Sequence, residues 1–394
     1  MSDTLRTLTP ADKPAYLRLM SQAFERGRVI ADDNAFWDET FGAETTGIFD
    51  GDTMQAVVTV RSFGVHWHAS RTGTLFMGGI AGVATHIEAR GRGHIDRLLR
   101  DALVKMRDAG MVISALYPFS WAFYRRFGWE WVGEKHIITL PLNEIKATPE
   151  GRFVREIAPD KARETLTPVY ERYAAKFHGV FAVHSHQWKD KLAHSDGRTT
   201  FVYGYFPDNA ETCEAYLLWR YDGQGSDGGE IREFVADTPA GFRALFGFLH
   251  YLGTQCRMAK LSAPSALPVW QQLYHWGIET KIVPVIQARV VDVCAAMEQL
   301  AMPQTISPDA TVTLQITDDA APWNNGAFLV SVENGAIRCA PALDLGVSDV
   351  SLDIQAFSQA FWGDPALPAL RDAGRIEITN ERGYKTLAIL LPAT

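Results

Sequence analysis

Hydrophobic and polar positions follow two different rhythms in the first third of the chain. Near the N-terminus, apolar residues recur every three or four positions behind a potential cap, Thr9-Pro10, and this predicts an amphipathic helix. Strands are expected over 53–61, 63–68 and 72–85, because Val57, Val58 and Val60 make the first of them β-prone and Gly51 and Gly64 mark turns. The first domain is therefore expected to mix helices with a sheet.

A second amphipathic helix follows these strands, after a loop with the run Arg90-Gly91-Arg92-Gly93, and is expected to end at Gly110. Its apolar positions have helical spacing and are Ile95, Leu98, Leu99, Ala102, Leu103 and Met106. A strand over 111–117, a short helix or turn over 118–127 and a strand over 129–140 come next. The predicted order is strand, glycine loop, helix, strand, helix, strand.

The rest of the chain repeats this alternation without a second glycine loop of the same kind. Helices are expected over 162–177 and 240–258, among short β-prone strands. A third block begins near Arg289, contains a helix around 354–362, and is expected to end in a strand over 386–391. Elements that alternate in this way predict an α/β protein with mixed sheets.

Length and composition set the broad class. A chain of 394 residues is expected to form two or three domains, since domains average roughly 100–200 residues. The hydrophobic share of 47% and the charged share of 21% are ordinary for a globular protein. A net charge of -8 argues against nucleic acid as a partner, because phosphate binding needs clustered basic residues. It leaves cationic substrates such as amines open.

No run approaches the ~18 apolar residues of a membrane span, and the N-terminus lacks the pattern of a secretory signal. A cytoplasmic protein is therefore expected. The cysteines form no CxxC pair, so reduced buried thiols are favoured over a disulfide framework. They are Cys213, Cys256, Cys294 and Cys339. The pairs His184, His186 and His66, His68 lack further ligands, so no metal is expected.

The glycine loop can hold a phosphate. Backbone N–H groups at a helix start lack partners inside the helix and attract anions, and Gly91 and Gly93 would let a pyrophosphate approach closely. Arg90 and Arg92 add positive charge. An ordinary strand-to-helix turn with solvated arginines is the alternative for this run taken alone. A dinucleotide-binding fold is disfavoured because its glycine loop follows the first strand, whereas this one follows several.

With this order of elements, the sequence resembles the GNAT acetyltransferases, whose CoA loop reads R/Q-x-x-G-x-G/A. Arg90 and Gly93 match that pattern, and Ile95 departs from its last position. Several longer strings resemble a narrower group, the enhanced-intracellular-survival (Eis) acetyltransferases. They are GGIAGVATH over 78–86, ISALYPFSWAFYRRFGWE over 113–130, APWNNGAF over 321–328 and DVSLDIQAFSQAFWG over 349–363.

The resemblance covers nearly the whole chain and implies two tandem GNAT-type domains followed by a sterol-carrier-protein-like α+β domain. It implies an acetyl-CoA-binding domain over 1–145 and a degenerate GNAT-like domain over 151–288. The C-terminal domain is expected over 289–394 and would end in an active-site carboxylate. The resemblance also implies acetyl-CoA as co-substrate, no metal, and a homo-oligomer, plausibly a hexamer.

By position, the resemblance implies a strand end that aligns the pantetheine arm, a loop that holds the pyrophosphate, and two residues beside the arm. These acetyl-CoA-binding residues are Val83, Ala84, Thr85, Arg90, Gly91, Arg92, Gly93, His94, Ile95, Asp96, Phe119 and Ser120. Phe24, Glu25 and Trp37 stand where this family places part of its amine pocket.

The resemblance also implies the catalytic pair. Tyr124 would be the general acid, because a hydroxyl with a pKa near ~10 keeps its proton at neutral pH and can donate it to a thiolate. Its alternative is a tyrosine that caps the core. The carboxylate of Thr394 would accept the amine proton, although the family more often ends on an aromatic residue. A frayed tail is the alternative there.

The predicted function is acetyl-CoA-dependent N-acetylation of a primary amine. The acceptor would be a small-molecule amine, an aminoglycoside-like polyamine or a lysine side chain. The alternative is a lipid- or sterol-binding protein that works through residues 290–394 and carries a vestigial first domain. The intact glycine loop and Tyr124 favour the enzyme.

Overall fold

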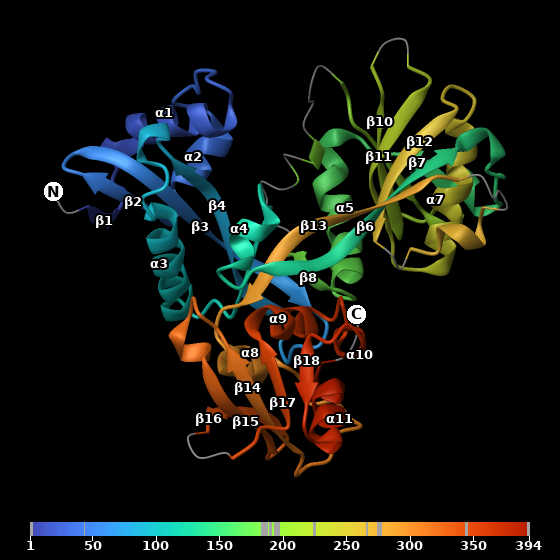
Figure 1. Cartoon of the computed structure of the whole chain (residues 1–394). Coiled ribbons are helices and arrows are strands. Elements are labelled where there is room, and N and C mark those ends of the chain that lie inside the picture. The colour runs from blue at the N-terminus through green and yellow to red at the C-terminus, as the bar shows by residue number, and fades with distance from the viewer. Residues whose placement is uncertain are drawn as a thin grey trace. The chain divides into compact units, whose positions relative to one another are not determined.

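A computed structural model of the chain describes residues 3–42, 44–182, 188, 191–192, 198–223, 226–264, 267–273, 278–342 and 346–391. The chain forms two compact units (Figure 1). One consists of Met1–Gly133 together with Ile286–Thr394, and the other is Glu134–Val285. The N-terminal and C-terminal parts of the chain thus fold against each other in the first unit.

The N-terminal part of the first unit contains a twisted sheet with the strand order β1-β2-β3-β4-β5-β13. Its strands are β1 (Thr4–Thr7), β2 (Glu44–Asp50), β3 (Thr53–Trp67), β4 (Thr74–Thr85), β5 (Ile113–Leu116) and the end of β13 (Thr280–Val290). Its helices are α1 (Lys13–Phe24), α2 (Ala35–Gly42), α3 (His94–Asp108) and α4 (Trp121–Arg125). Only β4 and β5 run parallel, so the sheet is mixed, as expected.

The two predicted amphipathic helices are present. Before α1, the carboxylate of Asp12 accepts the Thr9 backbone N–H at 2.7 Å, which is half of a capping box. The helix then buries Tyr16, Leu19 and Met20. Helix α3 buries its predicted apolar stripe against the sheet: Leu98, Leu99, Ala102, Leu103 and Met106 are at most 3% exposed. Apolar spacing therefore located both helices correctly.

The C-terminal part of the first unit is an α+β layer with the strand order β16-β15-β14-β17-β18. Its strands are β14 (Thr311–Thr317), β15 (Gly326–Glu333), β16 (Ala336–Pro341), β17 (Val350–Asp353) and β18 (Ile376–Ile378). Its helices are α8 (Val293–Gln299), α9 (Ile354–Trp362), α10 (Leu367–Asp372) and α11 (Glu381–Leu390).

The second unit contains its own mixed sheet, with the order β6-β12-β11-β10-β9-β7. Its strands are β6 (Glu130–Pro141), β7 (Val154–Glu156), β9 (Phe201–Tyr205), β10 (Ala215–Tyr221), β11 (Gly228–Ala236) and β12 (Met258–Pro264). The short strand β8 (His178–Phe181) lies outside this order. Helices α5 (Pro159–Ala174) and α7 (Pro239–Leu252) pack on this sheet. The α/β class with mixed sheets is confirmed in both units.

The strand predicted over 386–391 is wrong, because residues 386–390 belong to helix α11 and Leu391 is its C-cap. The Asn380 side chain caps that helix by accepting the Arg382 N–H at 3.0 Å. The buried residues Tyr384, Leu387 and Leu390 lie three apart on one helical face. A short apolar run cannot by itself distinguish a strand from a buried helical turn, and here the spacing decides for the helix.

The prediction that all four cysteines are reduced is also wrong. Cys294 on α8 and Cys339 on β16 form a disulfide, with their Cα atoms 4.8 Å apart. The two cysteines are 45 residues apart in the sequence, so only the packing of α8 on β16 brings them together. Cys213 and Cys256 are free and buried.

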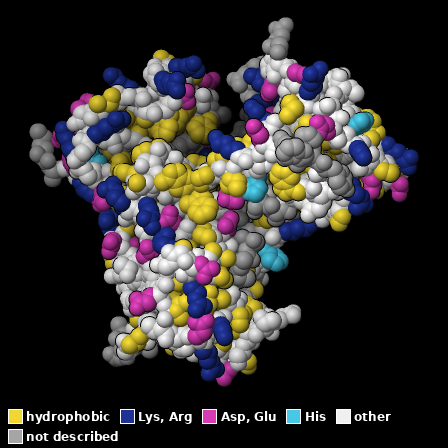
Figure 2. Space-filling model, turned by 45° about the vertical axis from the view of Figure 1, so that its right-hand side comes forward, with side chains coloured by type: hydrophobic (Ala, Val, Ile, Leu, Met, Phe, Trp, Pro, Cys, Tyr) yellow, Lys and Arg dark blue, Asp and Glu magenta, His cyan; other side chains and the backbone are white. Residues whose placement is uncertain are grey.

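The surface carries mixed charge where it is visible. On the face drawn in Figure 2, lysine and arginine side chains lie interspersed with aspartate and glutamate, so that face has no broad basic region. This agrees with the net charge of -8. Among the described helices, none is long and apolar enough to cross a membrane.

Candidate active site

The central feature of the candidate site is the point where two parallel strands separate. Strand β4 pairs with β5 only through Met77, Gly78 and Gly79, yet β4 continues to Thr85. Over those last six residues β4 is paired with β3 on its other side. The β5 side of β4 therefore presents unpaired backbone groups, which a ligand with amide groups can bind.

A bulge bends β4 within this unpaired stretch. Val57 pairs with Ala84 and Thr59 pairs with Ala81, so Gly82 and Val83 together oppose the single residue between them. Gly82 has a φ of +55°, which favours glycine. A bulge of this kind bends the strand and increases its twist, and it lies beyond Gly79, where the pairing of β4 with β5 ends.

The predicted cofactor residues of this strand end lie on both faces of the sheet. Val83 packs against the core cluster that contains Tyr124, whereas Ala84 belongs to the cluster that contains Trp37. Adjacent residues of a strand point to opposite faces, so the end of β4 borders both the predicted acid and the predicted amine pocket. Thr85, the last residue of the strand, is half-buried.

The glycine loop leads from this strand into α3 through a short 3-10 turn, Ile87–Ala89. Gly91 and Gly93 have φ values of +77° and +78°, in the left-handed region that side chains rarely adopt. Apart from each glycine's two chain neighbours, no atom of the described residues lies within 4 Å of a Cβ built at Gly91 or Gly93. The loop therefore needs glycine for its backbone conformation, and the space above it is open.

Gly93 is the N-cap of α3, so the first N–H groups of a 15-residue helix open onto this space. Arg90 and Arg92 are exposed, and Arg92 Nη2 donates to the Glu88 carbonyl at 3.0 Å. Asp96 is exposed in the first turn and pairs with Arg100 at 3.0 Å, which offsets its charge. The arrangement is a helix N-terminus suited to a pyrophosphate.

His94 and Ile95 can contribute to this site only through their backbones. The His94 side chain is 3% exposed and lies 3.5 Å from the Asp3 carboxylate. Ile95 is partly buried against the core below. The departure of Ile95 from the family pattern thus places a larger side chain in the core and leaves the loop surface unchanged.

Tyr124 lies in the short helix α4, which begins at Ser120. The Ser120 hydroxyl caps the helix by accepting the Phe123 N–H at 3.4 Å. The ring of Phe119 meets the Tyr124 ring edge-on, with centroids 5.2 Å apart. Phe119 is itself 69% exposed, so a large aromatic ring stands uncovered directly beside the buried tyrosine.

The Tyr124 side chain is 3% exposed, and burial raises the pKa of its hydroxyl well above the ordinary value. Among the described residues no hydrogen bond to this hydroxyl is found, in contrast to Tyr170, whose hydroxyl donates to the Phe181 carbonyl. Tyr124 thus holds a proton at neutral pH and has a hydroxyl free to donate it.

The three residues predicted to contact an amine lie together, with two aromatic rings and one carboxylate, where α1 meets α2. Trp37 meets Phe24 at 5.6 Å between ring centroids, and its indole N–H donates to the Glu25 carboxylate at 3.4 Å. Phe36, which was not predicted, also contacts Trp37, at 5.0 Å. Phe24 and Phe36 are at least half exposed. Aromatic faces beside a carboxylate are suited to a cationic amine.

Thr394 lies outside the described residues, as do His184 and His186. Within the described part of the chain, no group of three or more metal-ligating side chains comes together.

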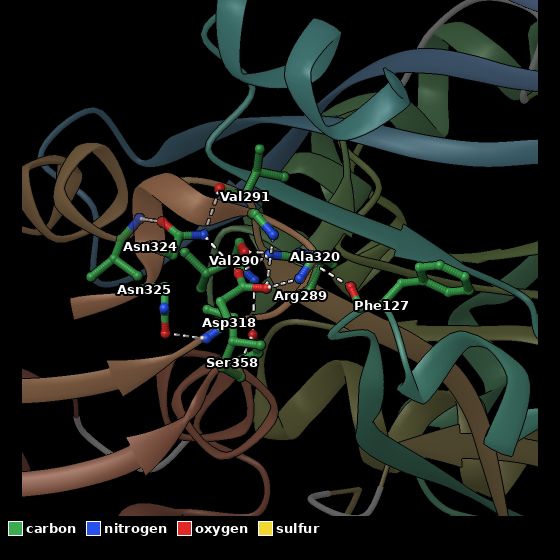
Figure 3. A network of polar contacts seen from close by, with 12 residues as sticks. Phe127, Arg289, Val290, Val291, Asp318, Ala320, Asn324, Asn325 and Ser358 are labelled. Atoms are coloured by element: carbon green, nitrogen blue, oxygen red, sulfur yellow. Dashed lines mark hydrogen bonds and ion pairs between the residues drawn. The ribbon is translucent and has the colours of Figure 1, made fainter. Parts of the chain in front are cut away.

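The segment that carries Tyr124 is held by side chains that were not expected to reach it. Gln287 and Arg289 extend from the end of β13 and donate to backbone carbonyls on either side of Tyr124. Arg289 is fully buried and bound to Asp318 (Figure 3). Two polar residues at alternate positions within the apolar run Ile286–Val291 were the only sequence signal.

Comparisons with known proteins match three parts of this chain to described domain families. Two family models described as acetyltransferase (GNAT) domain match residues 4–132 and 179–290. A model described as sterol carrier protein domain matches residues 293–394. An uncharacterized N-acetyltransferase from Streptomyces avermitilis is 21% identical over 412 aligned residues, which cover 98% of this chain and 95% of the relative.

Solved structures share the fold along the whole chain. A GCN5-related N-acetyltransferase from Anabaena variabilis has a TM-score of 0.85 at 19% identity, covering 100% of this chain and 98% of its own. Eis1 from Mycobacterium abscessus has a TM-score of 0.80 at 18% identity, covering 100% and 97%. The second unit thus has the fold of an acetyltransferase domain although it lacks the glycine loop.

Proposed function

Because this chain is an Eis-like GNAT N-acetyltransferase, with two acetyltransferase domains followed by a sterol carrier protein domain, we propose that its first domain transfers acetyl from acetyl-CoA to a primary amine. The acceptor is a small-molecule amine, an aminoglycoside-like polyamine or a lysine side chain. The second domain, over 151–288, binds no acetyl-CoA. The chain assembles into a homo-oligomer, a hexamer by resemblance, which light scattering would test.

One observation carries this proposal: the separation of β4 from β5 lies beside an open glycine loop and a buried tyrosine. Acetyl-CoA has three parts, and each has a counterpart here. The pyrophosphate fits the α3 N-terminus at Gly91 and Gly93. The amides of the pantetheine arm fit the unpaired edge of β4 over Val83–Thr85. Phe119 and Ser120 border the arm on the β5 side.

The reaction needs no covalent enzyme intermediate. The amine lone pair attacks the thioester carbonyl carbon, the C–N bond forms, and the C–S bond breaks with the electron pair leaving on sulfur. Tyr124 gives its hydroxyl proton to that sulfur, so CoA departs as a thiol. The proton that the amine loses passes to a base, and the tyrosine regains a proton from solvent. Backbone N–H groups at the β4 bulge polarise the carbonyl.

The base in this proposal is the carboxylate of Thr394. An alkylammonium ion with a pKa near ~10 must lose its proton before attack, so a nearby carboxylate aids the reaction at neutral pH. The amine is held by Phe24, Glu25 and Trp37, whose aromatic faces and carboxylate attract a cation. Glu25 acting through a water is the next candidate for the base.

The direct test is a panel of primary amines and lysine peptides with acetyl-CoA, read by release of free thiol. We expect turnover with at least one amine class and none without an amine. Thermal shifts with acetyl-CoA and with a panel of fatty acids separate this function from lipid binding, since only a ligand of the native state raises its stability. A shift with fatty acids alone would contradict the proposal.

The role of Thr394 has its own test. Extending the chain by a few residues moves the terminal carboxylate, and deleting the last four residues withdraws it. Either change should lower turnover, and the loss should shrink at higher pH, where more of the amine is already deprotonated. A loss that does not vary with pH would assign the tail a structural role. Full activity of a protein with a C-terminal tag would remove Thr394 from the mechanism.

A further inference from the structure

The segment that carries Tyr124 is short and has few hydrogen bonds of its own. Helix α4 has five residues, and the chain then turns through Gly128, with a φ of +87°, into β6. A helix this short leaves most of its carbonyls without partners inside the helix. Several carbonyls of this segment are bound by side chains from the end of β13 and from helix α9.

Gln287 spans the segment. Its side-chain Nε2 donates to the Trp121 carbonyl at 3.1 Å and to the Trp129 carbonyl at 3.0 Å. Trp121 is the first residue of α4 and Trp129 directly precedes β6, so one amide group joins the two ends of the segment that contains Tyr124. Gln287 is fully buried. The indole of Trp129 further donates to the Ser114 hydroxyl of β5 at 3.2 Å.

Arg289 binds the middle of the segment. Its Nη1 donates to the Phe127 carbonyl, its Nη2 to Asp318 at 2.5 Å, and its Nε to the Val290 carbonyl at 3.0 Å (Figure 3). The Phe127 N–H in turn donates to the Tyr124 carbonyl at 2.9 Å. A Cβ at Gly128 would lie 2.7 Å from the guanidinium, so glycine is needed for this close approach.

The C-terminal domain fixes the other end of this network. Asp318 accepts hydrogen bonds from the Ala320 and Ala321 N–H groups at 3.0 and 3.1 Å, and from the Asn324 side chain at 3.0 Å. Asn324 Nδ2 also donates to the Val291 carbonyl at 2.9 Å. Figure 3 shows Ala320 and Asn324 beside Asp318, which in turn binds Arg289. A buried charge held by so many partners has one available geometry.

Helix α9 adds two further contacts to the same segment. Gln355 donates to the Arg125 carbonyl at 2.8 Å, and Gln359 donates to the Trp131 carbonyl at 2.9 Å. The two residues are four apart and lie on one face of the helix. Five carbonyls between positions 121 and 131 therefore receive side-chain donors from residues 287–359.

We propose that Gln287 and Arg289 are positioning residues for the acetyl transfer. The sterol-carrier-type domain contributes by binding Arg289 through Asp318 and by binding the segment directly through Gln355 and Gln359. The inference rests on the proposed role of Tyr124 as general acid. The Tyr124 hydroxyl has no hydrogen bond among the described residues, so its direction depends on where the backbone of α4 is held. A shift of about 1 Å in a catalytic group can lower the rate 10²-fold.

The first test replaces Gln287 with Met, which keeps the length of the side chain and removes both donors without adding charge. We expect kcat to fall by about 10- to 100-fold while KM for acetyl-CoA stays within about twofold, because the loop at Gly91 and Gly93 is untouched. A milder variant, Gln355→Met, removes one donor from a half-buried position of α9 and should lower kcat by a smaller factor. It remains informative if Gln287→Met folds poorly.

The decisive measurement combines Gln287→Met with Tyr124→Phe. If Gln287 acts through the Tyr124 hydroxyl, the double variant should have the kcat of Tyr124→Phe alone. An equal fold-loss from Gln287→Met in both backgrounds would show that its effect does not pass through Tyr124, and this would overturn the proposal. Gln355→Met in the Tyr124→Phe background gives the same comparison independently.

Asp349→Asn is the matched control for a general loss of stability. Asp349 accepts the Thr313 N–H at 2.8 Å and the Asn380 side-chain amide at 2.7 Å, in the same domain but without contact to the segment over 121–131. It should lower Tm and leave kcat unchanged. If Asp349→Asn reduces kcat as strongly as Gln287→Met, the C-terminal domain is a general support and the proposal is wrong.

The same experiments separate this inference from the proposed function. Full turnover of Tyr124→Phe would remove the acid on which both depend. Impaired turnover of Tyr124→Phe, with Gln287→Met adding its full effect on top, would leave the acid in place and reject the positioning network alone.

Discussion

The first and second acetyltransferase domains build the same parallel strand–helix–strand unit and connect it differently. In the first domain, β4 pairs with β5 over three residues, and the two strands then separate. In the second domain, β11 pairs with β12 from Gly228 to Ile231, and these strands then separate as well. An eight-residue loop leads from β4 to α3, whereas only Asp237 and Thr238 join β11 to α7. The strands alone therefore do not explain why an acetyl-CoA site is proposed in the first domain and not in the second.

The start of the following helix makes the difference. Gly93 leaves the N–H groups of α3 open, but in the second domain Thr238 accepts the Gly241 N–H at 3.0 Å and Pro239 has no N–H to offer. Asp237 directly precedes this cap, and its carboxylate pairs with Arg172 at 2.7 Å. A helix N-terminus that is capped by its own chain and flanked by a carboxylate does not favour a pyrophosphate.

At the sequence position that corresponds to the proposed acid, the second domain has a leucine. Tyr124 precedes Gly128-Trp129-Glu130, and at the same spacing Leu273 precedes Gly277-Ile278-Glu279. Leu273 packs into the core of the second unit. A pocket of about 370 Å³ remains beside the start of α7, lined by apolar side chains such as Phe177 and Phe242. The second domain thus has the same fold without counterparts of the proposed anion site and the proposed acid at these positions.

The largest expected effect tests the glycine loop. Gly93→Val should abolish acetyl-CoA binding, because a β-branched residue cannot keep a φ of +78° and its side chain would fill the space proposed for the pyrophosphate. Gly110→Val is the matched control: Gly110 has a φ of +76°, equally open surroundings, and lies at the other end of α3.

Both valine variants should lose about 1–2 kcal/mol of stability, the cost of a side chain in the left-handed region. Only Gly93→Val should lose binding in calorimetry. Unchanged affinity of folded Gly93→Val would place the acetyl-CoA site elsewhere.

The next effect tests the acid. Tyr124→Phe keeps the ring and should preserve folding and acetyl-CoA binding, while kcat falls by ~10²–10⁴-fold. Tyr170→Phe in the second domain is the control, since it removes a hydroxyl that donates to the Phe181 carbonyl at 2.8 Å. That change should cost about 1 kcal/mol of stability and leave kcat unaltered. If steady-state kinetics shows that Tyr170→Phe lowers kcat about as much as Tyr124→Phe does, Tyr124 is not the general acid.

Local patterns made the loop and its helix predictable from the sequence. Gly91 and Gly93 directly precede an apolar stripe, and the order of elements around them is a short-range property of the chain. The network at Arg289 could not be predicted, because its contact with the Phe127 carbonyl spans 162 residues and only the packed core brings the two together. The disulfide between Cys294 and Cys339 escaped prediction for the same reason.

A smaller effect concerns pH. Burial raises the pKa of Tyr124 above its ordinary value of about 10, so its hydroxyl stays protonated at pH values where an exposed tyrosine ionises. Turnover should therefore show no falling limb up to about pH 10. The folded state also holds this proton more tightly than the unfolded state does. The Tyr124 hydroxyl therefore lowers the free energy of unfolding only as the pH rises above about 10. A pH–kcat profile that falls between about pH 8 and 9 would contradict the buried acid.

The smallest effect belongs to the helix start of the second domain. Thr238→Ala removes the side chain that caps α7, and losing such a cap costs about 1 kcal/mol of stability. Because Pro239 and Asp237 still keep an anion away, the variant should bind one acetyl-CoA per chain, as the unaltered protein should, with the same affinity and turnover. Denaturant unfolding gives the stability, and calorimetric titration gives the stoichiometry. Two equivalents of acetyl-CoA in either protein would mean that a glycine loop is not required, and the contrast between the two domains would lose its physical basis.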